Sequence, residues 1–174
     1  PNNTIQDGYY CVTISALHCI ELQEALHTNA SATNHDEHFT AVMSGTVPRV
    51  GNSLVKVAET IRRDGIITQR FDASGLTEEQ FYAKAPADGD LADGQKWLAE
   101  NTYSWEWVNP DDVSEALKYG PVQATINNGF MDSQGRWLRD TSTTADNHAV
   151  CLLKKDADGT VTYLDSYEPF IRRL

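Results

Sequence analysis

The sequence is poor in cysteine, in basic residues and in long apolar runs, and each shortage excludes a class of protein. Three cysteines among 174 residues are too few for the disulfide framework of a small secreted domain. Acidic residues outnumber basic ones by 25 to 14, and the net charge of −11 argues against nucleic acid and anionic membranes as partners. No apolar run approaches the roughly 18 residues of a membrane span. We therefore expect no nucleic acid and no membrane among the partners.

The length and composition are those of one globular domain with a substantial core. Hydrophobic residues make up 40% of the chain and charged residues 22%, which is ordinary for a folded domain. We expect residues 1–174 to form a single domain, divided into two lobes. The chain begins with Pro1 rather than Met, so we expect a processed form or part of a longer polypeptide.

Apolar periodicity divides the chain into a mainly helical first part and a mainly β second part. It predicts helices over residues 11–27, 54–63, 92–101 and 110–118, with a short helix starting near residue 77. It predicts strands over residues 66–71, 103–108, 121–127, 148–154 and 160–164. Polar and glycine-rich stretches predict loops over residues 28–52 and 128–147. The expected fold is α+β, with a helical lobe over about residues 1–100 and an antiparallel β lobe over about residues 101–174.

Cys11 opens the first predicted helix and is the strongest candidate for a catalytic residue. The positive end of a helix dipole favours the thiolate, which is the nucleophilic form of cysteine. Cys19 and Cys151 each lie inside an apolar run, so we expect them to be small buried hydrophobic residues. This use of cysteine fits a reducing compartment.

Two further residues complete a candidate catalytic triad. His148 begins a predicted strand and Asp165 follows the next one, with a turn over residues 156–159 between the two strands. Adjacent strands would bring both side chains to one edge, facing Cys11 on the helical lobe. In that arrangement His148 would pair with the thiolate and then protonate the leaving amine, while Asp165 would orient the imidazole.

These residues lie in segments that resemble the papain-like cysteine peptidases over most of the chain. The matching segments are Cys11 with Ser15-Ala16 and Glu21, Gly120-Pro121-Val122, His148-Ala149-Val150, and Asp165-Ser166-Tyr167. The resemblance implies a two-lobed fold with the nucleophile on the helical lobe and the His and Asp on the β lobe. It also implies a cysteine endopeptidase that hydrolyses peptide bonds through a Cys11 thioester, with no cofactor and no metal ion.

The resemblance assigns further roles around the triad. The side-chain amide of Gln6, with the backbone N–H of Cys11, would hold the oxyanion. The residues expected to bind a peptide or protein substrate are Gly51, Asn52, Asn147 and Tyr167. The ring of Tyr167 would also cover the pair of His148 and Asp165 from water.

The chain departs from the family pattern in three places. Gln6 lies five positions before Cys11, whereas the family places this glutamine six positions before the nucleophile. Asp165 replaces the usual Asn, as in the bacteriocin-processing double-glycine peptidases, although the 137 residues between Cys11 and His148 (148 − 11) suit the papain-like layout. The chain ends soon after Asp165 and lacks the family's disulfide cysteines. We therefore expect a trimmed, divergent member from the cytoplasm or from a phage or mobile element.

Two other functions stay open. The shifted Gln6 and the short C-terminal part favour a catalytically inactive domain that binds peptides or proteins. The same thiol chemistry would also suit an amidase that acts on cell-wall peptides, or transfer to an amine instead of water.

Two other sequence features suggest metal sites but have simpler explanations. The run from His35 to His38 has metal-binding residue types, and we expect a solvated loop there. Residues 156–159 lack the later acidic ligands of a calcium loop, so we expect a hairpin turn.

Overall fold

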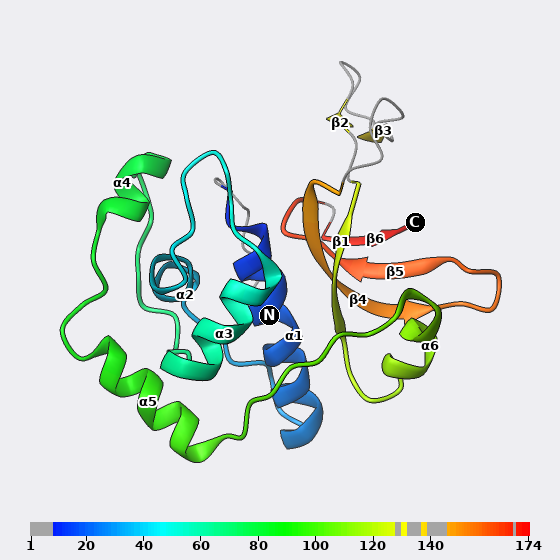
Figure 1. The fold of residues 1–174 in the computed structure, drawn as a ribbon, viewed down its shortest axis with the longest axis horizontal. Coiled ribbons are helices and arrows are strands. Elements are labelled where there is room, and N and C mark those ends of the chain that lie inside the picture. Colours follow the sequence, from blue (N-terminus) through cyan, green and yellow to red (C-terminus); the bar gives the residue numbers. More distant parts are fainter. Residues whose placement is uncertain (1–8, 128–129, 132–136, 139–145, 169) are drawn as a thin grey trace.

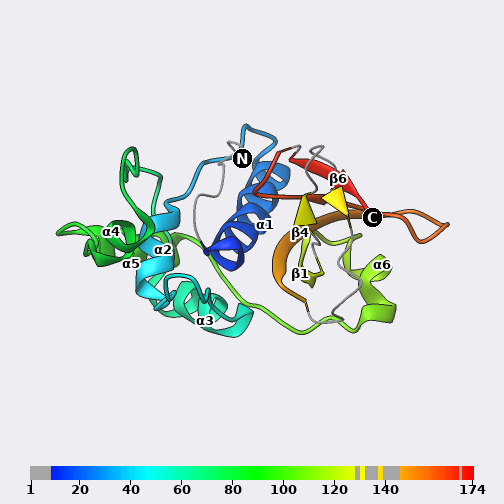
Figure 2. The ribbon, with the colours of Figure 1, turned by 90° about the horizontal axis from the view of Figure 1, so that it is seen from above.

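The computed structural model describes residues 9–127, 130–131, 137–138, 146–168 and 170–174 of the chain. These residues form two lobes, one of helices and one built on an antiparallel sheet (Figure 1, Figure 2), so the α+β prediction is confirmed. Helix α1 (Cys11–Thr28) lies between the lobes and contacts both the other helices and the sheet. Within the described ranges, no helix combines the length and the apolar character needed to cross a membrane.

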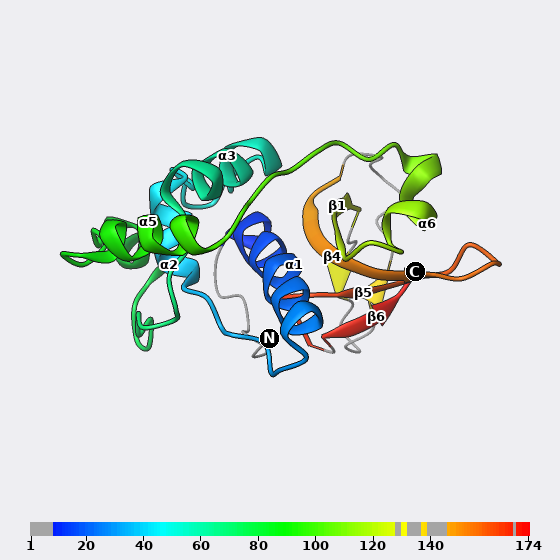
Figure 3. The same cartoon turned by 90° about the horizontal axis from the view of Figure 1, so that it is seen from below.

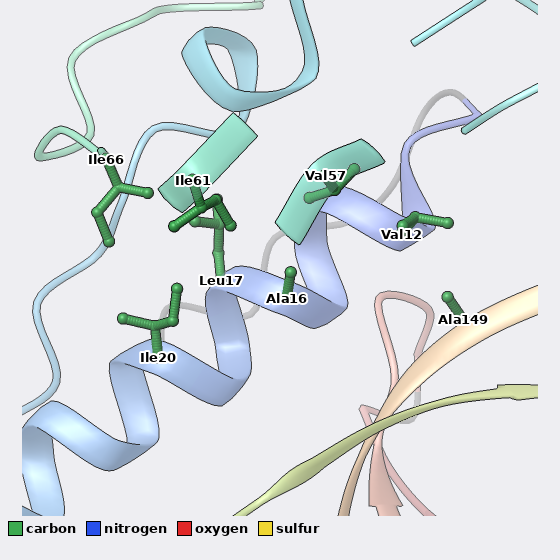
Figure 4. Close-up of a cluster of buried hydrophobic side chains, with 8 residues drawn as sticks. All are labelled: Val12, Ala16, Leu17, Ile20, Val57, Ile61, Ile66 and Ala149. Carbon is green, nitrogen blue, oxygen red and sulfur yellow. The ribbon is translucent and has the colours of Figure 1, made fainter. Parts of the chain in front are cut away.

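Shorter helices lie on the side of α1 away from the sheet (Figure 1). These are α2 (Glu37–Met43), α3 (Leu54–Asp64), α4 (Glu78–Ala83) and α5 (Asp90–Glu100), and α2 and α3 among them pack against α1. Nearly all residues of α1 from Val12 to Glu21 are buried, as its all-round apolar pattern predicts. Leu17 of α1 packs with Ile61 of α3, and Ala149 of the β lobe belongs to the same cluster (Figure 4). The first turns of α1 are therefore held by both lobes.

The β lobe is a four-stranded antiparallel sheet with the strand order β1-β4-β5-β6. Its strands are β1 (Val122–Ile126), β4 (His148–Lys155), β5 (Val161–Leu164) and β6 (Ile171–Arg173), while β2 (Phe130–Met131) and β3 (Trp137–Leu138) pair with each other. A 3-10 turn, η1 (Pro110–Asp112), leads into α6 (Val113–Ala116), which covers the sheet on the side away from α1 (Figure 1). Val113 packs there with Val150 and Leu152 of β4. The predicted hairpin between β4 and β5 is confirmed.

The segment over residues 101–109 crosses from the helical lobe to the β lobe (Figure 3), and the prediction of a strand there is wrong. Its alternating pattern has another cause, because the side chains of Tyr103 and Trp105 contact the helical lobe. Tyr103 packs against the core cluster of α1, and the indole N–H of Trp105 donates to Glu59 Oε1 of α3 over 2.8 Å. An extended segment with one side on a helix shows the same alternation as a strand.

Three other local predictions are also corrected. The expected loop over residues 28–52 contains α2, and the expected loop over residues 128–147 contains β2 and β3. Residues 66–71 form no strand and share only an isolated bridge between Thr68 and His35. Beyond this bridge their backbone bonds to a side chain, since Asp36 Oδ2 accepts from the N–H groups of Arg70 (2.9 Å) and Phe71 (2.8 Å).

The run from His35 to His38 is buried rather than solvated, so that prediction is wrong. Asp36 is the N-cap of α2, where its Oδ1 accepts from the N–H of Phe39 over 2.9 Å. The ring of His35 bonds to Glu24 (2.8 Å), and the ring of His38 stacks on Phe71. In the part of the chain that the structure describes, no group of three or more His, Cys, Asp or Glu residues could hold a metal ion.

Candidate active site

Cys11 is the first residue of α1 and lies half-buried where the helical lobe meets the β lobe. The first N–H groups of a helix have no acceptor within that helix, so they present partial positive charge to the thiol. Burial raises the pKa of the Cys11 thiol, but hydrogen bonds from His148 and from the backbone of Ala149, with the charge of His148, outweigh burial. The net pKa therefore lies below that of an ordinary thiol.

His148 is the first residue of β4 and is buried between Cys11 and Asp165. Its Nε2 lies 2.7 Å from Asp165 Oδ1, which leaves Nδ1 for the thiol of Cys11. Burial lowers the pKa of His148, but the hydrogen bonds and negative charges of Asp165 and Cys11 outweigh burial and raise this pKa to about 9. The arrangement favours a thiolate paired with an imidazolium near neutral pH.

Asp165 is completely buried directly after β5, and several groups fix its carboxylate. Its own N–H donates to the carbonyl of Phe170 (2.7 Å), and its Oδ1 accepts from the N–H of Tyr167 (3.2 Å). Its Oδ2 forms an ion pair with Arg172 Nη1 of β6, at 3.2 Å. The side chain of Arg172 is only 9% exposed, so this is an ion pair of the interior.

Sequence reasoning missed Arg172. Its guanidinium also donates to the carbonyl oxygens of Tyr167 (3.3 Å) and Glu168 (2.9 Å), which fixes the turn that follows Asp165. The sequence does indicate a cationic partner for Asp165, because a buried Asp in place of a neutral Asn requires a compensating cation. The sequence alone does not say which of the later arginines supplies it.

Tyr167 lies beside the imidazole, as expected. Its ring centroid is 5.3 Å from that of His148, with 34° between the ring planes. Asn147 is exposed next to His148, and its N–H donates to the carbonyl of Ile126 over 3.0 Å, which extends the pairing of β1 with β4. Tyr167 therefore flanks the imidazole, and the backbone of Asn147 fixes the start of β4.

Gly51 and Asn52 lie in the turn that precedes α3. Gly51 has φ +91°, and a Cβ there would lie 3.4 Å from the carbonyl oxygen of Tyr9, two residues before Cys11. The N–H and C=O of Gly51 both bond to Val47, so only a further lone pair of the carbonyl is left for a substrate. The side-chain amide of Asn52 donates to Ser44 and to Thr46 Oγ1 (3.1 Å), which orients it into the helical lobe.

A second residue that sequence reasoning missed connects the lobes next to Cys11. Gln123 of β1 donates through Nε2 to the carbonyl of Val12 (2.7 Å) and to Ser15 Oγ (2.8 Å), both in the first turns of α1. No local pattern marks this glutamine, because its partners are more than 100 positions away in the sequence. It fixes the helix that carries the thiol against the sheet that carries the imidazole.

Gln6, expected to bind the oxyanion, lies outside the described residues. A cavity of about 450 Å³ lies in the helical lobe beside α5, with His35, Gln69 and Trp97 among its lining residues. Cys11, His148 and Asp165 do not line it, so the cavity and the candidate active site are separate.

Comparison with solved structures shows which known fold this arrangement shares. The bromelain protease of Ananas comosus, solved with an inhibitor, is 12% identical at a TM-score of 0.60, and the match covers 98% of this chain and 82% of that one. A cysteine protease of Carica candamarcensis, also solved with an inhibitor, is 13% identical at a TM-score of 0.61, with the same coverage of 98% and 82%.

A digestive procathepsin L from the larval midgut of Tenebrio molitor is 17% identical at a TM-score of 0.57, and the chain covers 60% of that proenzyme. No model of a known protein family and no curated protein matches the chain. At these identities the likeness shows a papain-like fold, and function has to be argued from the site.

Proposed function

We propose that this protein is a papain-like cysteine endopeptidase that hydrolyses peptide bonds through a thioester on Cys11. One observation carries the proposal: Cys11, His148 and Asp165 form a hydrogen-bonded chain in which the thiol pKa is lowered and the imidazole pKa is raised to about 9. Opposite shifts of this kind stabilise a thiolate and an imidazolium together. The shared fold with cysteine proteases supports the same assignment.

The proposed reaction proceeds in two steps. The Cys11 thiolate attacks the carbonyl carbon of the peptide bond, and the tetrahedral oxyanion is held by the Cys11 backbone N–H and the Gln6 side chain. His148 donates its Nδ1 proton to the nitrogen of the leaving amine, and a thioester remains on Cys11. In the second step His148 takes a proton from water, the hydroxyl attacks the thioester, and the acid product leaves with the thiolate restored.

Other residues hold the reacting groups and the substrate in this proposal. Asp165 accepts the Nε2–H of His148, which fixes the tautomer that directs Nδ1 toward the thiol. Tyr167 covers the imidazole, and Asn147 and the carbonyl of Gly51 line the path of a peptide or protein substrate. Asn52 does not contact the substrate in this proposal. Its side-chain amide stabilises the turn that presents Gly51.

The pH dependence of cysteine alkylation tests the proposal. Iodoacetamide labelling is followed at each cysteine by mass spectrometry, and Cys19 and Cys151 serve as internal controls. We expect Cys11 to be labelled rapidly well below the ordinary thiol pKa of about 8.5, and His148→Ala to abolish the labelling at low pH. Labelling of Cys11 that rises only near that ordinary pKa would contradict the ion pair and indicate an inactive binding domain.

The reaction itself is tested with an unfolded protein substrate and with cell-wall peptides. We expect the parent protein to cleave the protein substrate and Cys11→Ala to have no activity with an unchanged unfolding midpoint. Cleavage that persists in Cys11→Ala would overturn the proposal. Activity on cell-wall peptides alone would replace the endopeptidase by an amidase with the same thiol chemistry.

A further inference from the structure

Two of the three cysteines lie close together, away from the candidate active site. The Sγ atoms of Cys19 and Cys151 are 3.3 Å apart, although the two residues are 132 positions apart in the sequence. A disulfide bond has a length of about 2.05 Å, so the two sulfurs would have to approach by only about 1.3 Å. Cys19 belongs to α1 and Cys151 to β4, so a bond between them would join the two lobes.

The surroundings of the pair keep the two sulfurs in place. Cys151 is completely buried in β4, and it pairs with Gln123 of β1 on one side and Leu164 of β5 on the other. Cys19 is half-buried on α1, whose close packing on β4 fixes its position. The hydrogen bond with Cys151, together with burial, raises the pKa of Cys19, so Cys19 is a thiol in the reduced protein.

The third cysteine is too distant to compete. Cys11 is eight residues before Cys19 on the same helix, which corresponds to about 12 Å along the axis. Only Cys19 is therefore within reach of Cys151 in the folded protein, and the pairing is specific.

We propose that Cys19 and Cys151 are a covalent modification site, at which a disulfide oxidant such as glutathione disulfide joins α1 to β4. A Cys19 thiolate attacks glutathione disulfide and forms a mixed disulfide while one glutathione leaves; Cys151 then attacks the Cys19 sulfur and the second glutathione leaves. The two protein thiols lose two electrons and two protons, and glutathione disulfide is reduced to two glutathione molecules. Because the pair is buried, the reaction is fastest during folding.

The bond would act on the part of the molecule that holds the candidate catalytic residues. Helix α1 carries Cys11, and β4 carries His148, so the disulfide fixes the two elements against each other. The disulfide would close a loop of 132 positions in the unfolded chain. This constraint on the unfolded state predicts a rise in Tm of roughly 10 °C. The inference does not depend on the peptidase assignment, because it concerns two residues outside the triad.

The test uses the full chain with Cys11→Ala, so that Cys11 forms no mixed disulfides. The protein is unfolded, reduced, and refolded either with reduced and oxidised glutathione or with dithiothreitol. We expect a linked peptide containing Cys19 and Cys151 and a mass about 2 Da lower in the oxidised sample, with a higher Tm. Iodoacetamide labels both residues only in the reduced sample after unfolding.

Two matched variants complete the experiment. Cys11→Ala with Cys19→Ala, and Cys11→Ala with Cys151→Ala, should each show no linked peptide and the same Tm in both buffers. Absence of the linked peptide after oxidative refolding of the Cys11→Ala protein would overturn the proposal, as would a linked protein with a lower Tm than the reduced one.

Discussion

His148 and His18 are both buried, yet at neutral pH only the imidazole of His148 is expected to carry a charge. Burial in α1 lowers the pKa of His18 to about 4, so that ring stays neutral. The pKa of His148 is raised to about 9, because Asp165 and Cys11 offer it a hydrogen bond and a negative charge each. The partners of a histidine, rather than its burial alone, therefore select the one that can act as an acid.

The charge of Asp165 should affect how activity depends on pH on the alkaline side, which is called the basic limb of the profile. Hydrolysis needs protonated His148, so the rate should fall as the pH rises through about 9, the pKa of that imidazole. Asp165→Asn removes a negative charge that helps to raise this pKa, so the limb should move to lower pH by about one unit. Measuring kcat/KM on a peptide substrate across the pH range gives the position of the limb.

The effect of Asp165→Asn on stability and on the basic limb should depend on Arg172. Asp165→Asn leaves a buried guanidinium without its anionic partner, and the added Arg172→Met removes that cation. The double variant should regain about 3 kcal/mol in the free energy of unfolding, and its basic limb should move back toward that of the parent. Arg173→Met is the matched control, because Arg173 is 65% exposed and pairs with Asp156. A double variant identical to Asp165→Asn in both measurements would show that the two residues are independent.

The candidate triad could be predicted from the sequence, whereas Arg172 and Gln123 could not. Cys11, His148 and Asp165 each lie at the end of an element with a clear local pattern, and the hairpin between β4 and β5 brings His148 and Asp165 together. Arg172 reaches Asp165 only because β6 turns back onto β5, and Gln123 reaches α1 only once the lobes meet. Such contacts depend on the tertiary fold, and no periodic pattern in the sequence indicates them.

The contact between α3 and α5 depends on Gly65, directly after α3, and on Gly94. Gly94 lies inside α5, and a Cβ there would overlap the carbonyl oxygen of Asp64 at the end of α3. Alanine is the better helix former by about 1 kcal/mol, so propensity alone predicts a stabilising substitution. We expect Gly94→Ala to destabilise the protein by about 1–3 kcal/mol instead, because the overlapping atom belongs to the backbone and cannot rotate away. Urea denaturation measures the difference.

Gly120→Ala is the control for that substitution. A Cβ at Gly120 would meet the end of the Gln23 side chain, which can move to another rotamer. Its unfolding midpoint should therefore stay close to that of the parent. A Gly94→Ala protein as stable as the parent would contradict the close approach of α3 and α5.

Helices with a one-sided or all-round apolar pattern were predictable, but those held by buried polar groups were not. The apolar run of α1 indicates a buried helix, and the spaced apolar residues of α3 indicate one with an exposed face. Helix α2 escaped prediction because it begins with a run of polar residues that are buried. Asp36 makes this possible, since its carboxylate caps α2 and also binds the backbone of Arg70 and Phe71.

At the scale of the whole molecule, α1 is shared between the two lobes. It packs with α2 and α3 on one side and with β4 and β1 on the other (Figure 1, Figure 3). The order of helical and β segments in the sequence indicates the two lobes, but it does not specify how they dock. Docking is decided by particular contacts, and these include the hydrogen bonds from Gln123 to Val12 and Ser15 in the first turns of α1.

Gln123→Ala should therefore weaken the docking of the lobes and the candidate active site together. Losing the bonds to the Val12 carbonyl and Ser15 Oγ should lower the free energy of unfolding by about 1–2 kcal/mol. It should also slow the alkylation of Cys11 at low pH, because α1 is then held less firmly against β4. Gln95→Ala is the matched control, since Gln95 also donates to a backbone carbonyl, that of Arg63, but within the helical lobe. Equal alkylation rates in the two variants would show that Gln123 stabilises the fold without positioning the thiol.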